Sequence, residues 1–213
     1  MNRCVKPIVL KTDEVNEMTK RHSMKVPCGR CFNCLKNRAK QWTFRLGEEL
    51  SVSESAVFTT LTYNEESLSW TKSGKMNLNP QDHVKLMKRI RKNYDFHPRF
   101  PLKYYAVGEY GTTSQRPHFH QIAFNLPESI ITPQWDEQNN IWRYKELEDI
   151  WSHGNVSCDN VTMARIGYVT GYLQKNIRDE DPNRNDDRER EKSYMSKGLG
   201  KSYLSDEIVG YYK

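Results

Sequence analysis

Three runs of the chain combine β-branched and aromatic residues in the way that strands do. They lie at about residues 56–63 (AVFTTLTY), 103–110 (KYYAVGEY) and 118–125 (HFHQIAFN). A short loop containing Gly and Pro joins the second run to the third, which favours antiparallel pairing. A fourth strand is predicted within residues 154–162, and Ser73-Gly74 marks a hairpin turn.

Apolar residues at helical spacing predict helices between these strands. In NPQDHVKLMKRIRKNY, Val84, Met87 and Ile90 fall on one face. The run opens with Asn79 as a helix cap and Pro80 in the first turn. Further helices are predicted at about 35–50, 143–151 and 163–176. Strands and helices interleave without a repeated βαβ period, so we predict an α+β domain built on an antiparallel sheet.

The chain divides by composition into two parts. Residues 1–50 contain 11 Lys/Arg against 5 Asp/Glu and the remainder balances at 22 against 22, so this segment holds the whole net charge of +6. A basic face suits a polyanion such as nucleic acid. We therefore take 1–50 as a Cys-rich segment with a helix, and 51–213 as the main domain. Residues 178–192, of which 12 in 15 are charged, predict a mobile loop.

The apolar runs of the chain are short. None reaches the roughly 18 to 20 residues of a membrane span, and the N-terminus lacks the apolar core of a signal peptide. We expect a cytosolic protein with no membrane partner. The five cysteines then favour thiols or metal ligands over disulfides.

His118 and His120 flank Phe119 in the third strand, so their side chains project from one face. Glu109, at the end of the preceding strand, is the natural third ligand of a metal held by both imidazoles. Two imidazoles and one carboxylate leave coordination positions open for water and substrate. Zinc hydrolases and non-haem iron oxygenases use the same ligand set. A pair of histidines that only packs across strands is the alternative.

GYVTGYLQK places two tyrosines on one helix face. Tyr168 and Tyr172, at i and i+4, address one point, with Lys175 one turn beyond. Gly167 and Gly171 each cost a helix about 1 kcal/mol relative to Ala, which suggests that something approaches the backbone closely. A phenol attacks a phosphodiester if a divalent ion polarises the phosphate, and Lys175 would stabilise the developing charge. Tyrosines packed under a loop are the alternative.

Cys28, Cys31 and Cys34 occur at a spacing of three, and Cys4 lies far upstream. Cys-x2-Cys is a usual unit of closed structural zinc sites, which have four thiolate or imidazole ligands. We predict structural Zn²⁺ here, with Cys4 as the favoured fourth ligand and His22 as the alternative. Without zinc, the cysteines are small residues at the start of the helix.

The His-hydrophobe-His strand and the later YxxxYxxK helix resemble the HUH endonuclease superfamily, specifically the two-tyrosine rolling-circle replication initiators of the microviruses. FTTLTYN resembles the first strand motif of that family, RPHFH its metal motif and YVTGYLQK its nucleophile motif. PCGRCFNCLKNRAKQW resembles the N-terminal cysteine block of the gokushovirus-like branch, and MSKGLGKSYL its C-terminal motif. The resemblance follows the family's order along nearly the whole chain.

The resemblance implies a ferredoxin-like (RRM-like) antiparallel sheet packed with helices, and Mg²⁺ or Mn²⁺ held by His118 and His120. One tyrosine would nick single-stranded origin DNA, keep the 5′ phosphate and free a 3′ hydroxyl that primes synthesis. The second would cut the regenerated origin, and the ends would be rejoined. The protein would act in the cytoplasm of a bacterial host. Host helicase and polymerase would assist, since the chain has no phosphate-cradling GxxxxGK[ST] loop.

Basic and aromatic side chains would hold the DNA strand. We expect base stacking on Tyr63 and phosphate contacts from five basic residues: Arg30, Lys36, Arg38, Lys40 and Arg116. Each of these charges has plain surface exposure as its alternative. A nucleic-acid-binding module with packed histidines, and a metal hydrolase or oxygenase without a covalent intermediate, are the competing functions.

Overall fold

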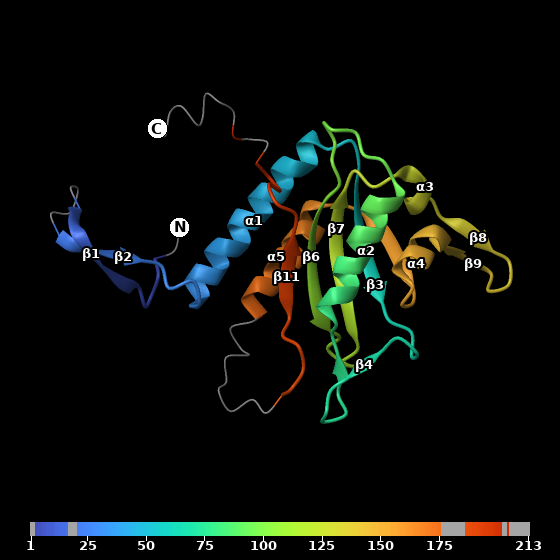
Figure 1. Ribbon diagram of the computed structural model, residues 1–213, viewed down its shortest axis with the longest axis horizontal. Helices are drawn as coiled ribbons and strands as arrows, with labels where there is room; N and C mark the ends of the chain where they lie inside the picture. Colours follow the sequence, from blue (N-terminus) through green and yellow to red (C-terminus); the bar gives the residue numbers. More distant parts are fainter. Residues whose placement is uncertain (1–2, 17–20, 176–185, 202–203, 205–213) are drawn as a thin grey trace.

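The main sheet of the protein is antiparallel, with the predicted histidine strand at its centre. The computed structural model describes residues 3–16, 21–175, 186–201 and 204. In these residues β7 (Pro117–Phe124) pairs with β3 (Ala56–Thr62) on one side and with β6 (Lys103–Tyr110) on the other. β10 (Val156–Asn160) and β11 (Lys192–Met195) complete the order β10-β3-β7-β6-β11 (Figure 1). The predicted α+β class with an antiparallel sheet is confirmed.

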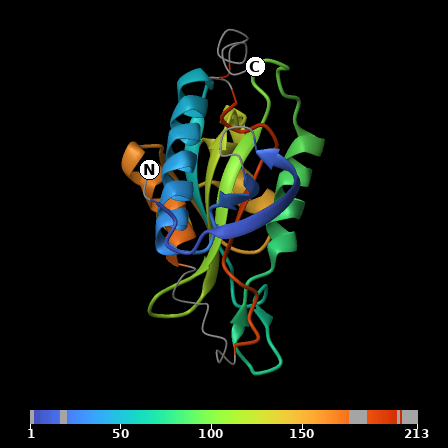
Figure 2. The same ribbon diagram turned by 90° about the vertical axis from the view of Figure 1, so that its left-hand side faces the viewer.

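Helices cover both faces of this sheet. α1 (Phe32–Val52) and α5 (Met163–Lys175) pack on one face. α2 (Pro80–Asn93) and α4 (Lys145–Trp151) pack on the other, and the short α3 (Glu128–Ile131) contacts α4. Figure 2 shows the sheet between α1 in blue, with α5 in orange beside it, and α2 in green. Among the described residues, no helix has the length and apolar character needed to cross a membrane.

The alternation of side chains along β7 divides the interior into two cores. Ile122 and Phe124 point towards α1 and α5, where they are fully buried with Leu46 and Ile166. The intervening residues point towards α2 and pack with its apolar face: Phe119 and Ala123 against Leu86, Met87 and Ile90. His118 and His120 have the same parity as Ile122, so they lie on the face covered by α5.

Three short hairpins extend from this body. They are β1 (Ile8–Asn16) with β2 (Arg21–Val26), β4 (Ser69–Trp70) with β5 (Met76–Asn77), and β8 (Gln134–Asp136) with β9 (Ile141–Arg143). The turn predicted at Ser73-Gly74 joins β4 to β5 and is confirmed, with Gly74 at φ +74°. The β1–β2 hairpin was not predicted; it lies away from the main sheet, at the left of Figure 1, beside the start of α1.

Two predicted boundaries differ in the structure. α1 begins at Phe32, three residues before the predicted start, with Cys31 at its N-cap position. The loop predicted for residues 178–192 is wrong for Lys192, because β11 begins there and pairs with Gly108 of β6. Residues 176–185 lie outside the described part of the chain. In the described remainder, Asp187 accepts a hydrogen bond from the Ser73 hydroxyl (2.6 Å).

Candidate metal and tyrosine site

The strand register brings the three predicted metal ligands together. Glu109 of β6 is paired with His118 of β7, and His120 is paired with Thr60 of β3. Oε1 of Glu109 lies 2.7 Å from Nε2 of His118 and 2.9 Å from Nε2 of His120. One ligand atom from each residue lies within 4.8 Å of the others. This arrangement of two imidazole nitrogens and a carboxylate oxygen fits a divalent cation with open coordination positions.

The other ring nitrogen of each histidine is held by the protein. His118 Nδ1–H donates to the carbonyl oxygen of Arg116 (3.1 Å). His120 Nδ1 lies 3.0 Å from the Thr60 hydroxyl oxygen. Such partners fix the ring orientation and the tautomer that a metal ligand needs. Thr60 was missed from the sequence, although it belongs to the strand motif FTTLT and becomes recognisable once the register of β3 and β7 is known.

Burial and hydrogen bonding act in opposite directions on these groups. Glu109 is 3% exposed. Burial alone would raise the pKa of its carboxyl, but hydrogen bonds from His118 and His120 outweigh burial and lower it. Burial alone would lower the pKa of His118, but the hydrogen bond to Glu109 outweighs it and raises the pKa. The cluster therefore holds a carboxylate among cationic or metal-bound imidazoles.

α5 places both predicted tyrosines beside the second histidine. The Tyr168 ring centroid is 5.4 Å from that of His120, and the Tyr172 centroid is 6.4 Å from it. The Tyr172 hydroxyl donates a hydrogen bond to the Tyr168 hydroxyl. Tyr168 is 49% exposed, whereas Tyr172 is 5% exposed. Burial, the hydrogen bond with Tyr168 and the charge of Glu109 all raise the pKa of Tyr172.

Two further side chains border the tyrosine pair. The Phe58 ring stacks on His120 with centroids 5.4 Å apart, and the Arg165 guanidinium lies 5.7 Å from the Phe58 ring centroid. Arg165 is one turn before Tyr168 on α5 and also pairs with Asp159 (2.9 Å). Lys175 ends α5, but its side chain lies outside the described part of the structure.

The two glycines that precede the tyrosines have free space around them. A Cβ atom added to Gly167 or to Gly171 would meet no heavy atom within 4 Å, apart from the backbone of the helix itself. The protein itself therefore does not require a small residue at either position. The prediction that another molecule approaches this backbone stays a prediction.

Two predicted DNA contacts are contradicted. Tyr63 is 4% exposed, and its ring packs against Phe119 and Trp151 under α2, so it offers no face to a base. The Arg116 guanidinium donates to the Tyr63 carbonyl (2.8 Å) and pairs with Glu65 (2.6 Å). These contacts hold the loop before β7 against the end of β3, which accounts for the charge at residue 116.

The other predicted phosphate contacts lie at and along α1. Arg30 and Arg38 are exposed, and Lys36 is half-buried, with its ammonium 5.8 Å from the Phe32 ring centroid. Lys40 lines a groove of about 380 Å³ together with Phe44 and Met163, the first residue of α5. This basic surface is therefore on the same face of the sheet as the tyrosine pair.

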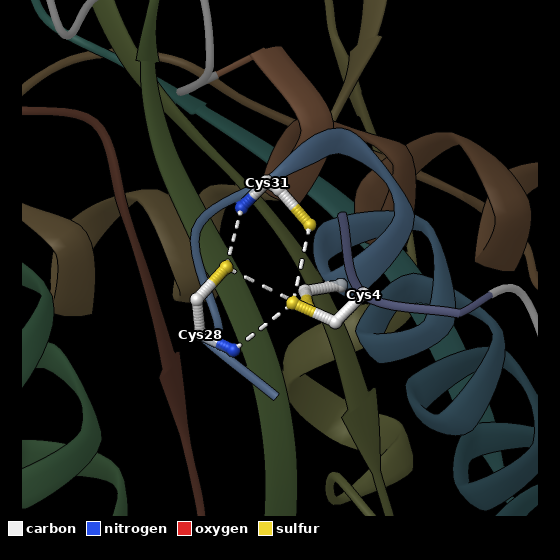
Figure 3. A group of neighbouring side chains, drawn as sticks. Cys4, Cys28 and Cys31 are labelled. Carbon is white, nitrogen blue, oxygen red and sulfur yellow. Dashed lines mark hydrogen bonds between the residues drawn. The ribbon is translucent and has the colours of Figure 1, made fainter. Parts of the chain in front are cut away.

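All four predicted cysteines form a second cluster, at the start of α1 (Figure 3). Sγ of Cys31 lies 3.8 Å from Sγ of Cys4, and Sγ of Cys28 lies 3.9 Å from Sγ of Cys34. A tetrahedral zinc site with Zn–S bonds of about 2.3 Å has sulfur–sulfur distances of about 3.8 Å, so the cluster has the right size. The side chain of His22 lies outside the described part of the chain.

Backbone groups prepare the cysteine cluster for a cation. The Cys28 N–H donates to Sγ of Cys4, and the Cys31 N–H donates to Sγ of Cys28, each at 3.3 Å. Hydrogen bonds from the backbone of Val5 and Cys34 lower the pKa of Cys31 to about 6. Burial raises the pKa of Cys34 to about 12, so ionising all four thiols needs a compensating positive charge.

Comparison with known proteins relates the chain to phage replication proteins. Residues 56–177 match the model of a family described under the name Replication-associated protein ORF2. The chain is 31% identical over 198 residues to Replication-associated protein ORF2 of Spiroplasma virus 4, a match that covers 88% of this chain and 59% of that protein. It is 30% identical over 195 residues to Replication-associated protein ORF4 of Chlamydia phage 1, covering 87% and 47%.

A third relative has a comparable match. Replication-associated protein VP4 of Bdellovibrio phage phiMH2K is 28% identical over 159 residues, covering 73% of this chain and 50% of that protein. The chain thus spans roughly half of the length of these curated relatives. No solved structure matches the chain. The metal and tyrosine residues all lie within the span of the family model, whereas the cysteine cluster precedes it.

Proposed function

Since the chain belongs to the family of the replication-associated protein ORF2, we propose that it initiates replication by nicking single-stranded origin DNA with a tyrosine nucleophile. The resemblance to phage replication proteins is confirmed by this family and by the three relatives. The proposal for the chemistry rests on one observation: Glu109, His118 and His120 converge beside the Tyr168–Tyr172 pair. We assign the domain to the HUH endonuclease fold on the same ground.

In this proposal Glu109, His118 and His120 hold Mg²⁺ or Mn²⁺. The donor set fits, because both Nε2 atoms and a carboxylate oxygen face one point while the Nδ1 atoms are engaged elsewhere. A bound divalent ion would polarise the scissile phosphate and offset its negative charge. A packing pair of histidines does not explain why a buried carboxylate contacts both Nε2 atoms.

Tyr168 is the proposed nucleophile of the first cut, because about half of its surface is exposed while Tyr172 is buried. Its oxygen bonds to phosphorus as the phenol loses its proton, and the bond from phosphorus to the 3′ oxygen breaks. The 3′ oxygen takes up a proton, so the products are a 5′-phosphotyrosine and a free 3′ hydroxyl. The hydrogen bond from Tyr172 orients the Tyr168 hydroxyl. After one round Tyr172 makes the second cut, and the held end is rejoined by attack of a 3′ hydroxyl.

The cysteine cluster is proposed to hold a structural zinc ion. Cys4 precedes β1 and Cys28 follows β2, so a shared metal fastens both ends of this hairpin to the start of α1. This assignment complements the endonuclease proposal, since a structural zinc site next to a basic helix serves DNA binding in either case.

The direct test is formation of a covalent adduct. The protein is incubated with Mn²⁺ and labelled single-stranded oligonucleotides that tile the genome encoding it. We expect a labelled protein band that survives denaturation, is strongly reduced in Tyr168→Phe, persists in Tyr172→Phe and is absent from the double variant. Tyr94→Phe, which removes a hydroxyl bonded to Glu146 on the α2 side of the sheet, serves as the control and should label normally.

Two outcomes would overturn the proposal. Retention of DNA without any adduct would favour a binding module. Release of cut fragments without a covalent intermediate would favour a metal hydrolase.

A further inference from the structure

β11 brings another carboxylate to the edge of the metal site. This strand pairs with β6 in the register Lys192↔Gly108 and Ser193↔Val107. One residue further along the same register, Glu191 lies opposite Glu109. The Tyr110 N–H donates to Oε1 of Glu191 (3.0 Å), which places the carboxylate at this end of β6.

The alternation of β11 gives the face on which Glu191 lies. Ser193 accepts a hydrogen bond from the Tyr105 hydroxyl (3.1 Å), and Met195 packs with the same α5-side core. Tyr194 points the other way and stacks on His83 in the α2-side core. Glu191 has the parity of Ser193 and Met195, so it lies on the α5 side with the metal ligands.

The charge of Glu191 reaches both parts of the site. For His118, burial opposes the charged form, but Glu109 outweighs burial and raises the pKa, and Glu191 adds to the increase. For Tyr172, burial raises the pKa most, and the negative charges of Glu109 and Glu191 raise it further. The electrostatic field of Glu191 therefore falls on the imidazoles and on the buried tyrosine.

We propose that Glu191 is an outer carboxylate of the divalent-metal site, positioned to accept hydrogen bonds from water bound to the cation. This inference rests on the proposed function for the existence of that site. Like charges on directly opposite strand positions are destabilising, and a divalent cation beside them removes the repulsion. Glu109 and Glu191 together balance the charge of one such cation. Added carboxylate oxygen also favours Mg²⁺ or Mn²⁺ over softer metals.

Glu191 lies beyond the span matched by the family model, which ends at residue 177. The highly charged segment before it separates α5 from β11 in sequence, yet the sheet returns the chain to the site. A purely structural role is the competing explanation, because Glu191 also satisfies the backbone N–H of Tyr110 where the β11–β6 ladder ends. A glutamine at this position keeps that acceptor and removes the charge.

The test measures Mn²⁺ binding directly, by electron paramagnetic resonance and calorimetry on the zinc-loaded full chain without DNA. We expect Glu191→Gln to weaken Mn²⁺ binding about tenfold, the size of effect that outer-shell partners have on metal affinity. Glu191→Asp, which keeps the charge, should bind more tightly than Glu191→Gln. The control Glu189→Gln removes a carboxylate of the same segment that pairs with Lys192 (2.5 Å), and should match the wild type.

The outcomes separate this inference from the function on which it rests. If the wild type binds Mn²⁺ and loses it in His118→Ala, the proposed metal site stands. Wild-type affinity in Glu191→Gln then overturns the role of Glu191 alone. If Glu191→Gln melts well below the wild type without Mn²⁺ and Glu191→Asp binds no better than it, the residue is structural and the inference fails. Absence of Mn²⁺ binding by the wild type overturns both.

Discussion

At the residue scale, the arrangement around His118 differs from that of an ordinary packed histidine. Its Nδ1–H donates to a main-chain carbonyl and its Nε2 faces a buried carboxylate that also contacts His120. A packed histidine needs only one polar partner to satisfy its ring. Two histidines directed at one carboxylate oxygen are therefore better explained as ligands.

Replacing His118 by alanine should abolish cleavage and leave most of the DNA affinity. The variant loses one of three metal ligands, so we expect DNA cleavage in Mn²⁺ to fall by more than about 100-fold. Affinity for a single-stranded oligonucleotide, measured by fluorescence anisotropy, should change little because phosphate contacts lie elsewhere. The control is His97→Ala, which alters an exposed histidine. Normal cleavage by His118→Ala would show that the ligand assignment is wrong.

Tyr63 gives the opposite expectation, stability without DNA binding. Its hydroxyl donates to Asp82 Oδ2 (3.1 Å) inside the α2-side core. Tyr63→Phe should lower the free energy of unfolding by about 1.5 to 3 kcal/mol, the usual contribution of a hydrogen bond to a charged group. Urea denaturation measures this change. A large loss of single-stranded DNA affinity in a folded Tyr63→Phe protein would return the residue to the DNA surface.

The sequence predicted the metal ligands and tyrosines because their spacing is local. Residues two apart on a strand and four apart on a helix share a face whatever the rest of the fold does. Thr60 and Glu191 depend on which strands pair and in which register, and that information is not local. Tyr63 was misassigned for a similar reason: its strand face is predictable, but the burial under α2 and Trp151 is not.

At the element scale, long periodic segments were predicted well and short ones were missed. β6 and α5 lie within one or two residues of the predicted ranges, and the Asn79 side chain caps α2 by accepting from the Gln81 N–H (3.1 Å). The β1–β2 hairpin was missed because Ile8, Val9 and Leu10 are consecutive and all exposed, without the alternation of a half-buried strand. A two-stranded hairpin packed on no sheet leaves no periodic signal.

The glycines of α5 test whether DNA approaches this helix. Alanine at Gly167 or Gly171 meets no neighbour within 4 Å, so each substitution should stabilise the fold by about 1 kcal/mol. Thermal melting measures that gain. If the scissile strand lies against the glycine face, cleavage should nevertheless fall in both variants. Gly47→Ala on α1, where only Met163 comes within 4.0 Å, is the control and should stabilise without slowing cleavage. Full activity in all three variants would remove the need for glycine beside the tyrosines.

At the scale of the whole molecule, the cysteine cluster joins the β1–β2 hairpin to the body. In the described residues, the Arg3 carbonyl also accepts a hydrogen bond from the Asn33 amide (2.7 Å), but the hairpin adds nothing to either core. Removing the metal should therefore free the hairpin and leave the sheet folded.

Limited trypsin digestion checks this expectation. After zinc chelation we expect rapid cutting at exposed basic residues such as Lys11 and Lys25, with the remainder of the chain resistant. Cys31→Ser should reproduce the pattern without a chelator, and Cys158→Ser, which alters a cysteine of β10, should not. An unchanged digestion pattern after chelation would show that zinc does not hold the hairpin.

The sheet also separates two basic surfaces, and only one of them adjoins the tyrosines. Lys36 and Lys40 lie on α1, beside α5, whereas Lys88 and Lys92 lie on α2 across the sheet. Both pairs have the i, i+4 spacing, so their charge reversals to glutamate change the net charge equally. If the DNA strand crosses the tyrosine face, reversing the α1 pair should weaken single-stranded binding far more.

The salt dependence of binding distinguishes a lost contact from a change in net charge. Each phosphate contact to single-stranded DNA contributes about 0.7 to the slope of log affinity against log salt, so loss of two contacts should lower that slope by about 1.4. We expect this change for Lys36→Glu/Lys40→Glu and almost none for Lys88→Glu/Lys92→Glu. Equal losses from both pairs would mean that only the overall charge matters. A larger loss from the α2 pair would place the DNA on the face opposite the metal site, where the tyrosines of α5 have no access to it.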